Sequence, residues 1–110
     1  MSGSMVYEVS LVVDVSLAER LMAWLRPHVR EMLTFDGFES ARINRQAHAS
    51  GSQTEFCVQY VLKDRACFHR YETAHAARMR AEGINAFPKG LSATRKMWQL
   101  CEVLSSVQST

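Results

Sequence analysis

With 110 residues, the chain is long enough to build one hydrophobic core and too short for two. Its 13 basic and 11 acidic residues are interspersed and give a net charge of +2, which provides no strong attraction to nucleic acid or an anionic membrane. No apolar run approaches the roughly 20 residues of a membrane span, and three widely spaced cysteines argue against a disulfide framework or a structural zinc site. We therefore expect a cytoplasmic globular protein.

The first part of the chain predicts a strand followed by a helix. Residues 5–14 alternate between an apolar face and a mixed face, as a half-buried strand does. Ser16 and Glu19 have the spacing of a capping box, so a helix is expected from about residue 17 to 33. Pro27 lies near the middle of that helix and should kink it.

The rest of the chain predicts three more strands and a second helix. Residues 38–46 and 55–63 alternate in hydrophobicity on either side of a short polar loop, which indicates a hairpin. The second helix is expected over residues 64–82, capped by its first residue, with Gly83 as its stop. A last strand is expected over residues 92–104.

The element order is therefore β-α-β-β-α-β, which with right-handed crossovers predicts a ferredoxin-like α+β fold: a four-stranded antiparallel sheet with two helices on one face. We expect the first and third strands at the centre, parallel to each other, and the two helices as neighbours. Residues 5–104 should form this single domain. Residues 1–4 are interpreted as an extension left by cloning, and 105–110 as a frayed tail.

The other face of such a sheet is open, and it has two common uses. Single-stranded RNA binding needs exposed aromatics on the central strands, but Tyr7, Phe56 and Tyr60 share the parity assigned to the helix side. We therefore expect no nucleic acid. Pairing of two open faces in a homodimer fits better, with a monomer that tolerates a mixed face as the alternative. The residues assigned to this face are Val6, Glu8, Ser10, Val12, Arg42, Cys57, Gln59, Val61 and Arg95, whereas Trp98 is assigned to the core.

Two histidines are the candidate catalytic residues. His28 and His75 each lie on the apolar stripe of a predicted helix, about 11 residues from its start, so side-by-side helices should bring them to one level. Imidazole is the side chain whose charge normally changes near neutral pH, which suits it to act as a general base. The alternative is that both rings are packed core residues. Candidate ligand-binding residues around a pocket between helices and sheet are His28, Tyr60, Tyr71, His75 and Arg78, with Arg80 as an alternative to Arg78.

Several segments together resemble a small bacterial family catalogued as a domain of unknown function. These segments are 28–33 (HVREML) with Gly37-Phe38, 57–60 (CVQY), Tyr71, His75-Ala76, 79–83 (MRAEG) and 92–95 (SATR). The resemblance spans nearly the whole chain from Val6 to Leu104. It implies a ferredoxin-like fold similar to the dimeric α+β-barrel superfamily, with no established reaction.

Two functional hypotheses remain open. In the first, the protein is a homodimer that binds a small molecule or a protein partner without catalysis. The alternative, implied by the dimeric-barrel superfamily, is a cofactor-independent small-molecule enzyme, monooxygenase-like or isomerase-like, that uses His28 or His75. We expect no cofactor. We also expect no metal, because a metal site needs a third good ligand and Glu72, at the edge of the same stripe, is the only nearby candidate.

Overall fold

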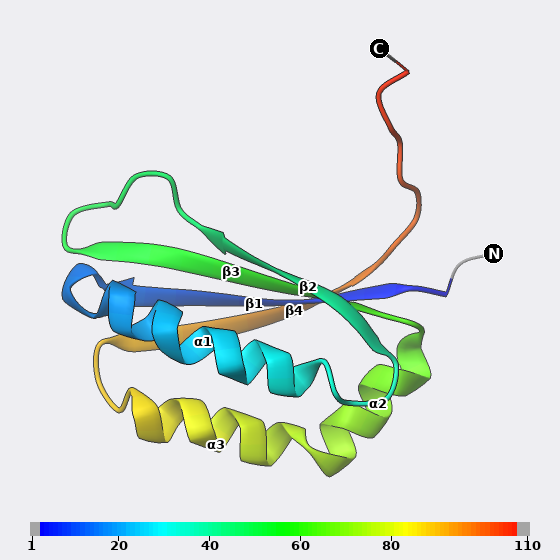
Figure 1. Cartoon of the computed structure of the whole chain (residues 1–110), viewed down its shortest axis with the longest axis horizontal. Coiled ribbons are helices and arrows are strands. Elements are labelled where there is room, and N and C mark those ends of the chain that lie inside the picture. The colour runs from blue at the N-terminus through cyan, green and yellow to red at the C-terminus, as the bar shows by residue number, and fades with distance from the viewer. Residues whose placement is uncertain (1–2, 108–110) are drawn as a thin grey trace.

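The computed structural model describes residues 3–107, which form a four-stranded sheet with helices packed on one face (Figure 1). Along the chain the elements are β1 (Met5–Asp14), the 3-10 helix η1 (Val15–Leu17), α1 (Ala18–Met32), β2 (Phe38–Arg45), β3 (Gln53–Leu62), α2 (Arg65–Ala74), α3 (Ala76–Ala86) and β4 (Leu91–Gln99). This is the predicted ferredoxin-like α+β fold. The predicted extension 1–4 and tail 105–110 lie partly outside the described residues.

The strands are ordered β2-β3-β1-β4, and every neighbouring pair is antiparallel. β1 and β3 are central, as expected, but they run in opposite directions, so the prediction that they are parallel is wrong. Each strand–helix–strand crossover joins two parallel strands that leave a gap between them. β3 fills the gap between β1 and β2 and must run the other way to return from the hairpin.

The core lies between the sheet and the helices, and strand alternation determines which side chains enter it. Tyr7 and Val13 of β1 and Phe56, Val58 and Tyr60 of β3 all point to the helix side and are almost completely buried. The same alternation places Glu8, Gln59 and their neighbours on the uncovered face. Because the central-strand aromatics are buried under helices, they are not available to stack on nucleic-acid bases.

The start of α1 differs from the predicted capping box. Leu17 is the N-cap and makes no side-chain cap hydrogen bond, while Glu19 pairs instead with Arg45 at 2.7 Å. The segment before α1 is hydrogen-bonded to the loop before β3, since the backbone N–H of Val15 donates to the carbonyl of Ser52 at 2.8 Å. That bond favours a 3-10 turn over an immediate α-helical start. Pro27 lies within a helix that continues to Met32.

The predicted second helix is interrupted. It divides at His75 into α2 and α3, and Gly83 lies inside α3 rather than at its end. Gly83 faces α1, since a Cβ there would lie 3.4 Å from the ring of Trp24. None of the helices in residues 3–107 is long and apolar enough to cross a membrane.

Strand β4 is shorter than predicted, and two of its side chains lie on the opposite face of the sheet from the one predicted. It ends at Gln99 instead of residue 104, because Gln99 pairs with Met5, the first residue of β1, and no partner strand continues beyond it. Arg95 pairs with Val9 on the helix side, so its assignment to the open face is wrong. Trp98 pairs with Val6 on the open face and is 49% exposed, so its assignment to the core is also wrong.

The turn before β2 yields a stability prediction. Gly37 has φ +84°, and a Cβ there would overlap the thiol of Cys67, whereas Gly51 has φ +61° with open space around it. Gly37→Ala should lower the free energy of unfolding by about 2 to 4 kcal/mol, through backbone strain plus overpacking. Gly51→Ala carries the strain alone and should cost about 1 kcal/mol. Urea denaturation of both variants checks this, and equal losses would contradict it.

Candidate functional site

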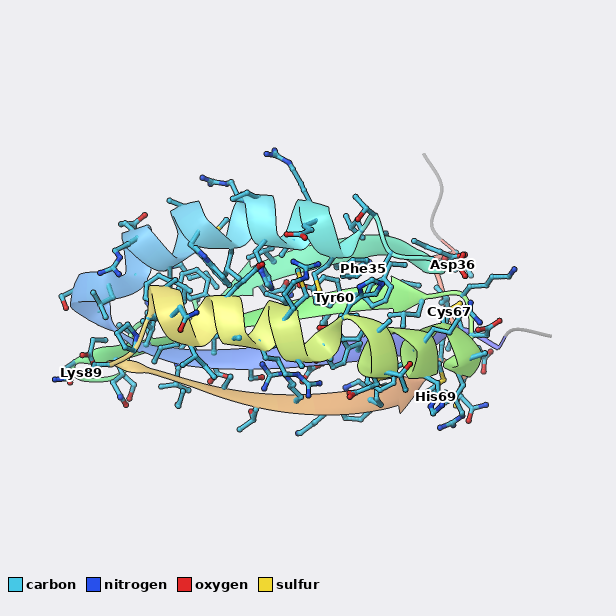
Figure 2. The ribbon with its side chains drawn as sticks, turned by 90° about the horizontal axis from the view of Figure 1, so that it is seen from below. Phe35, Asp36, Tyr60, Cys67, His69 and Lys89 are labelled. Atoms are coloured by element: carbon cyan, nitrogen blue, oxygen red, sulfur yellow. The ribbon has the colours of Figure 1, made fainter. Side chains whose placement is uncertain are left out.

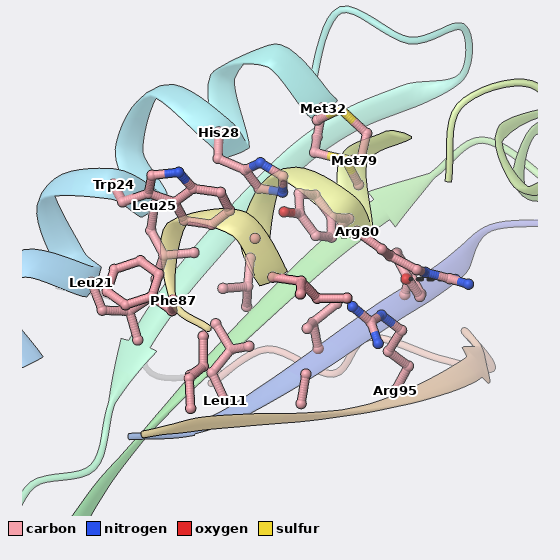
Figure 3. A pocket seen from close by; sticks show the side chains of 18 of the residues that line it. Leu11, Leu21, Trp24, Leu25, His28, Met32, Met79, Arg80, Phe87 and Arg95 are labelled. Atoms are coloured by element: carbon pink, nitrogen blue, oxygen red, sulfur yellow. Dashed lines mark hydrogen bonds between the residues drawn. The ribbon is translucent and has the colours of Figure 1, made fainter. Parts of the chain in front are cut away.

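A pocket of about 310 Å³ lies between the helices and the sheet (Figure 3). Its floor comes from the helix-facing side of β1 and β4, and its roof comes from α1 and α3. Ala93 and Arg95 of β4 line the floor yet are exposed, and Ile84 of α3 is 66% exposed. The helix layer therefore covers the centre of the sheet and leaves the pocket open beside β4, its edge strand (Figure 2).

One end of the pocket is apolar. Leu11 and Leu91 form its floor there, and Leu21 and Phe87 close it. The indole of Trp24 meets the ring of Phe87 edge to face, with centroids 5.9 Å apart. These side chains could hold the apolar or aromatic part of a ligand.

His28 provides a polar group in the roof. Its ring stacks on Trp24 with centroids 4.3 Å apart, and its Nδ1 atom is buried without a hydrogen-bond partner among the described residues. Burial lowers the pKa of His28 below 6.5, although the carboxylates of Glu82 and Glu31 act in the opposite direction. Burial therefore favours the neutral imidazole near pH 7.

Three tyrosines lie together at the opposite end of the pocket from Leu21. The ring of Tyr7 lies 5.8 Å from that of Tyr60 and 5.9 Å from that of Tyr71, measured between centroids. Burial raises the pKa of Tyr60 and of Tyr71 above that of a free phenol. Both hydroxyls therefore stay protonated and can donate a hydrogen bond.

Arg80 on α3 places a positively charged guanidinium next to the three tyrosines. Its guanidinium donates to the hydroxyl of Tyr7 at 3.3 Å and pairs with Glu72 at 2.9 Å. Its Nε atom is buried and has no hydrogen-bond partner in the described part of the chain. Two bonds from Nη2 thus hold the guanidinium in place.

Three of the five predicted ligand-binding residues line the pocket and two do not. His28, Tyr60 and Tyr71 are on its wall. His75 lies at the break between α2 and α3 and stacks on Phe35, with centroids 4.0 Å apart. Arg78 is engaged on the surface by Glu31 and Glu82, at 3.0 and 2.9 Å.

The two histidines are not at one level because α1 and α3 run in opposite directions. Arg20 near the start of α1 donates to the carbonyl of Ala86 at the end of α3, at 2.7 Å. Arg78 near the start of α3 reaches Glu31 near the end of α1. His75 precedes α3 and so lies beyond the end of α1, beside Phe35. Counting residues from each helix start would align them only if the helices ran the same way.

The sequence interpretation missed Arg95 as a pocket residue. Strand periodicity could have identified it, because Arg95 is separated by an even number of residues from the lining residues Leu91 and Ala93 and from half-buried Met97, and so lies on the same face. Within residues 3–107, no group of three or more metal-binding side chains comes together.

The fold and the pocket define a ferredoxin-like α+β protein with a ligand-sized cavity under its helices. More particularly, the chain belongs to the family described as Domain of unknown function (DUF4286), whose model matches residues 4–101. No curated protein sequence matches the chain.

Several solved structures share the fold at low sequence identity. A mutant of SnoaB from Streptomyces nogalater, a cofactor-independent oxygenase, has a TM-score of 0.72 at 13% identity, covering 96% of this chain and 100% of that one. A provisionally named monooxygenase from Shewanella loihica has a TM-score of 0.65 at 14% identity, with 94% and 99% covered. The de novo designed protein Foldit4 has a TM-score of 0.61 at 13% identity, with 89% and 99% covered. At these identities the likeness shows the fold alone.

The lowered pKa of His28 yields a pH prediction. The unfolded chain takes up a proton at His28 near pH 6.5, before the folded chain does, so stability should fall as pH drops from 6.5 through the folded-state pKa. His28→Gln should lose less stability than the wild type between pH 7.5 and 5.5 in urea denaturation. The NMR titration midpoint of His28 should lie below 6.5, and a midpoint at or above 6.5 would contradict the buried, neutral imidazole.

Proposed function

We propose that the chain binds a small, largely apolar organic molecule in the pocket between its helices and sheet, and that it does so as a homodimer in the cytoplasm. The observation that carries this is the pocket itself, an open space of about 310 Å³ that aromatic and aliphatic side chains line together with the imidazole of His28. A concave, mostly apolar space with a few polar groups is the usual form of a small-molecule site.

The pocket has the other properties of a ligand site. Its volume, about 310 Å³, is at the lower end of the range for small-molecule pockets. Aromatic and aliphatic side chains such as Trp24, Phe87 and Leu21 line one part of it. A few polar groups, among them His28 and Tyr71, converge on the same space and could fix the orientation of a ligand.

Binding of a neutral fluorescent probe tests the pocket. N-phenyl-1-naphthylamine should fluoresce more strongly and at shorter wavelength on binding. Ala93→Phe places a ring in the open side of the pocket and should weaken the apparent affinity at least about tenfold. Ala81→Phe adds the same ring at an exposed position of α3 outside the pocket lining and should leave affinity unchanged. Equal affinity in both variants would contradict the pocket as the binding site.

The homodimer is proposed to form through the open face of the sheet. Val6 and Val61 lie next to each other on that face and are half-buried, and Trp98 stands beside Val6. Three polar side chains of the face are already bonded to one another, since Gln59 donates to Glu8 at 3.2 Å and accepts from Asn44 at 3.4 Å. Bonds of this kind lower the cost of burying polar groups in an interface.

A change at one of the apolar positions of this face tests the dimer. Val61→Glu should give a monomer of 12.5 kDa, because pairing would bury a carboxylate without a partner. Val61→Thr keeps the shape without the charge and should retain a species of twice that mass. Light scattering after size exclusion measures both. A wild-type chain that remains at 12.5 kDa at high concentration would contradict the dimer.

A second candidate function is a cofactor-independent enzyme in which His28 is the general base. The neutral imidazole beside an apolar pocket favours it, because such a group can take a proton from a bound molecule. SnoaB, with the same fold, is a cofactor-independent oxygenase. His75 has no part in this proposal, since it lies outside the pocket lining.

Proton exchange tests the base directly. The small bicyclic ketone 2-tetralone carries acidic C–H bonds next to its carbonyl, and the wild-type protein should accelerate their exchange in D₂O. His28→Gln should reduce that acceleration about 100-fold, and His75→Gln should leave it unchanged. NMR measures the exchange. Acceleration that survives His28→Gln would exclude His28 as the base without affecting the binding proposal.

A further inference from the structure

We propose that the pocket selects an organic anion, with an aromatic or aliphatic body at its apolar end and a carboxylate at its other end between Arg80 and Arg95. This rests on the proposed ligand-binding function of the pocket and specifies the chemical class of the ligand. The charges that line the pocket, the arrangement of its two ends and the unused donors of Arg95 support it.

The charged residues that line the pocket are all cationic. Arg80 and Arg95 are part of the lining, and none of the lining residues is an aspartate or a glutamate. The charge of Arg95 also acts on the tyrosine hydroxyls that line the pocket. Burial raises the pKa of Tyr60 and Tyr71, and Arg95 acts against that rise in both. Glu72 already pairs with Arg80, so Arg95 provides the unbalanced positive charge, and an anion would meet a more favourable potential there than a cation would.

The strand register separates the cationic end from the apolar end. Arg95 pairs with Val9 and lies one row from Tyr7, whose hydroxyl accepts from Arg80. In the other direction, Leu11 pairs with Ala93, one row further along the same face. Both guanidinium groups lie to one side of the drawn residues in Figure 3, and Leu21 and Phe87 lie to the other. The two ends of the pocket therefore complement the two ends of an amphipathic acid: the apolar end its body, and the cationic end its carboxylate.

Arg95 keeps donors available for a carboxylate, and Arg80 is held in place on the same side of the pocket. The Nη2 nitrogen of Arg80 donates to both Tyr7 and Glu72. Arg95 forms no side-chain hydrogen bond or ion pair within residues 3–107, unlike Arg70 and Arg78, which are engaged by acidic residues. Guanidinium donors fit carboxylate oxygens in geometry and in charge.

Three probes with one ring system test the selectivity: 2-naphthoate, neutral 2-naphthamide and cationic 2-naphthylmethylammonium. Binding is followed by the indole N–H resonance of Trp24, which lines the pocket, and the resonance of Trp98 on the open face is the internal control. Naphthoate should bind at least about tenfold more tightly than the amide, and the ammonium compound should bind most weakly.

Substitutions of Arg95 test whether this residue causes the preference for the anion. Arg95→Gln should weaken naphthoate binding about tenfold and change amide binding less than about twofold, and Arg95→Lys should retain most of the preference. Arg30→Gln removes the same charge from an exposed position on α1 and should change neither.

The outcomes separate this inference from the function on which it rests. If the amide binds as tightly as naphthoate, or if Arg95→Gln leaves the preference intact, the pocket binds ligands but does not select an anion at this position. If none of the three probes shifts the Trp24 resonance, both the selectivity and the proposed pocket function are wrong.

Discussion

The antiparallel pairing of β1 with β3 is the interaction on which the rest of the structure depends. The pair runs over ten residues of each strand, from Met5 opposite Leu62 to Asp14 opposite Gln53. Because side chains alternate along a strand, this register sends Tyr7 and Tyr60 to the helix side together, and Glu8 and Gln59 to the open side. A shift of one residue would exchange the two faces and expose the aromatic core.

The pocket follows from how that sheet is covered. The helices bury the central strands, but β4 is an edge strand, and Ala93 and Arg95 remain exposed on its helix side. Small residues keep the space open, since Gly83 of α3 faces the ring of Trp24 and Ala93 fills little of the floor. The same edge position brings a cation into the pocket wall. One architecture therefore provides an apolar space, a neutral imidazole and a cationic end.

Much of the fold could be predicted from the sequence, because β1 and β3 have a clear period of two and the turns have typical residues. The candidate site was harder. His28, Tyr60 and Tyr71 were predicted from periodicity and do line one pocket, whereas His75 falls at a helix break that no glycine or proline marks. Side-chain alternation could have placed Arg95 correctly, but an arginine on an edge strand is usually assigned to solvent. The relative direction of packed elements, such as α1 and α3, cannot be predicted from the periodicity of each element alone.

The central claim is that the space under the helices is a ligand site rather than a packing gap. A crystal structure of the protein grown with 2-naphthoate tests it most directly. We expect electron density for the ring against Trp24 and Leu11, with the carboxylate within hydrogen-bond distance of Arg80 or Arg95. A pocket filled by rearranged side chains, with the naphthoate absent or bound elsewhere, would contradict it.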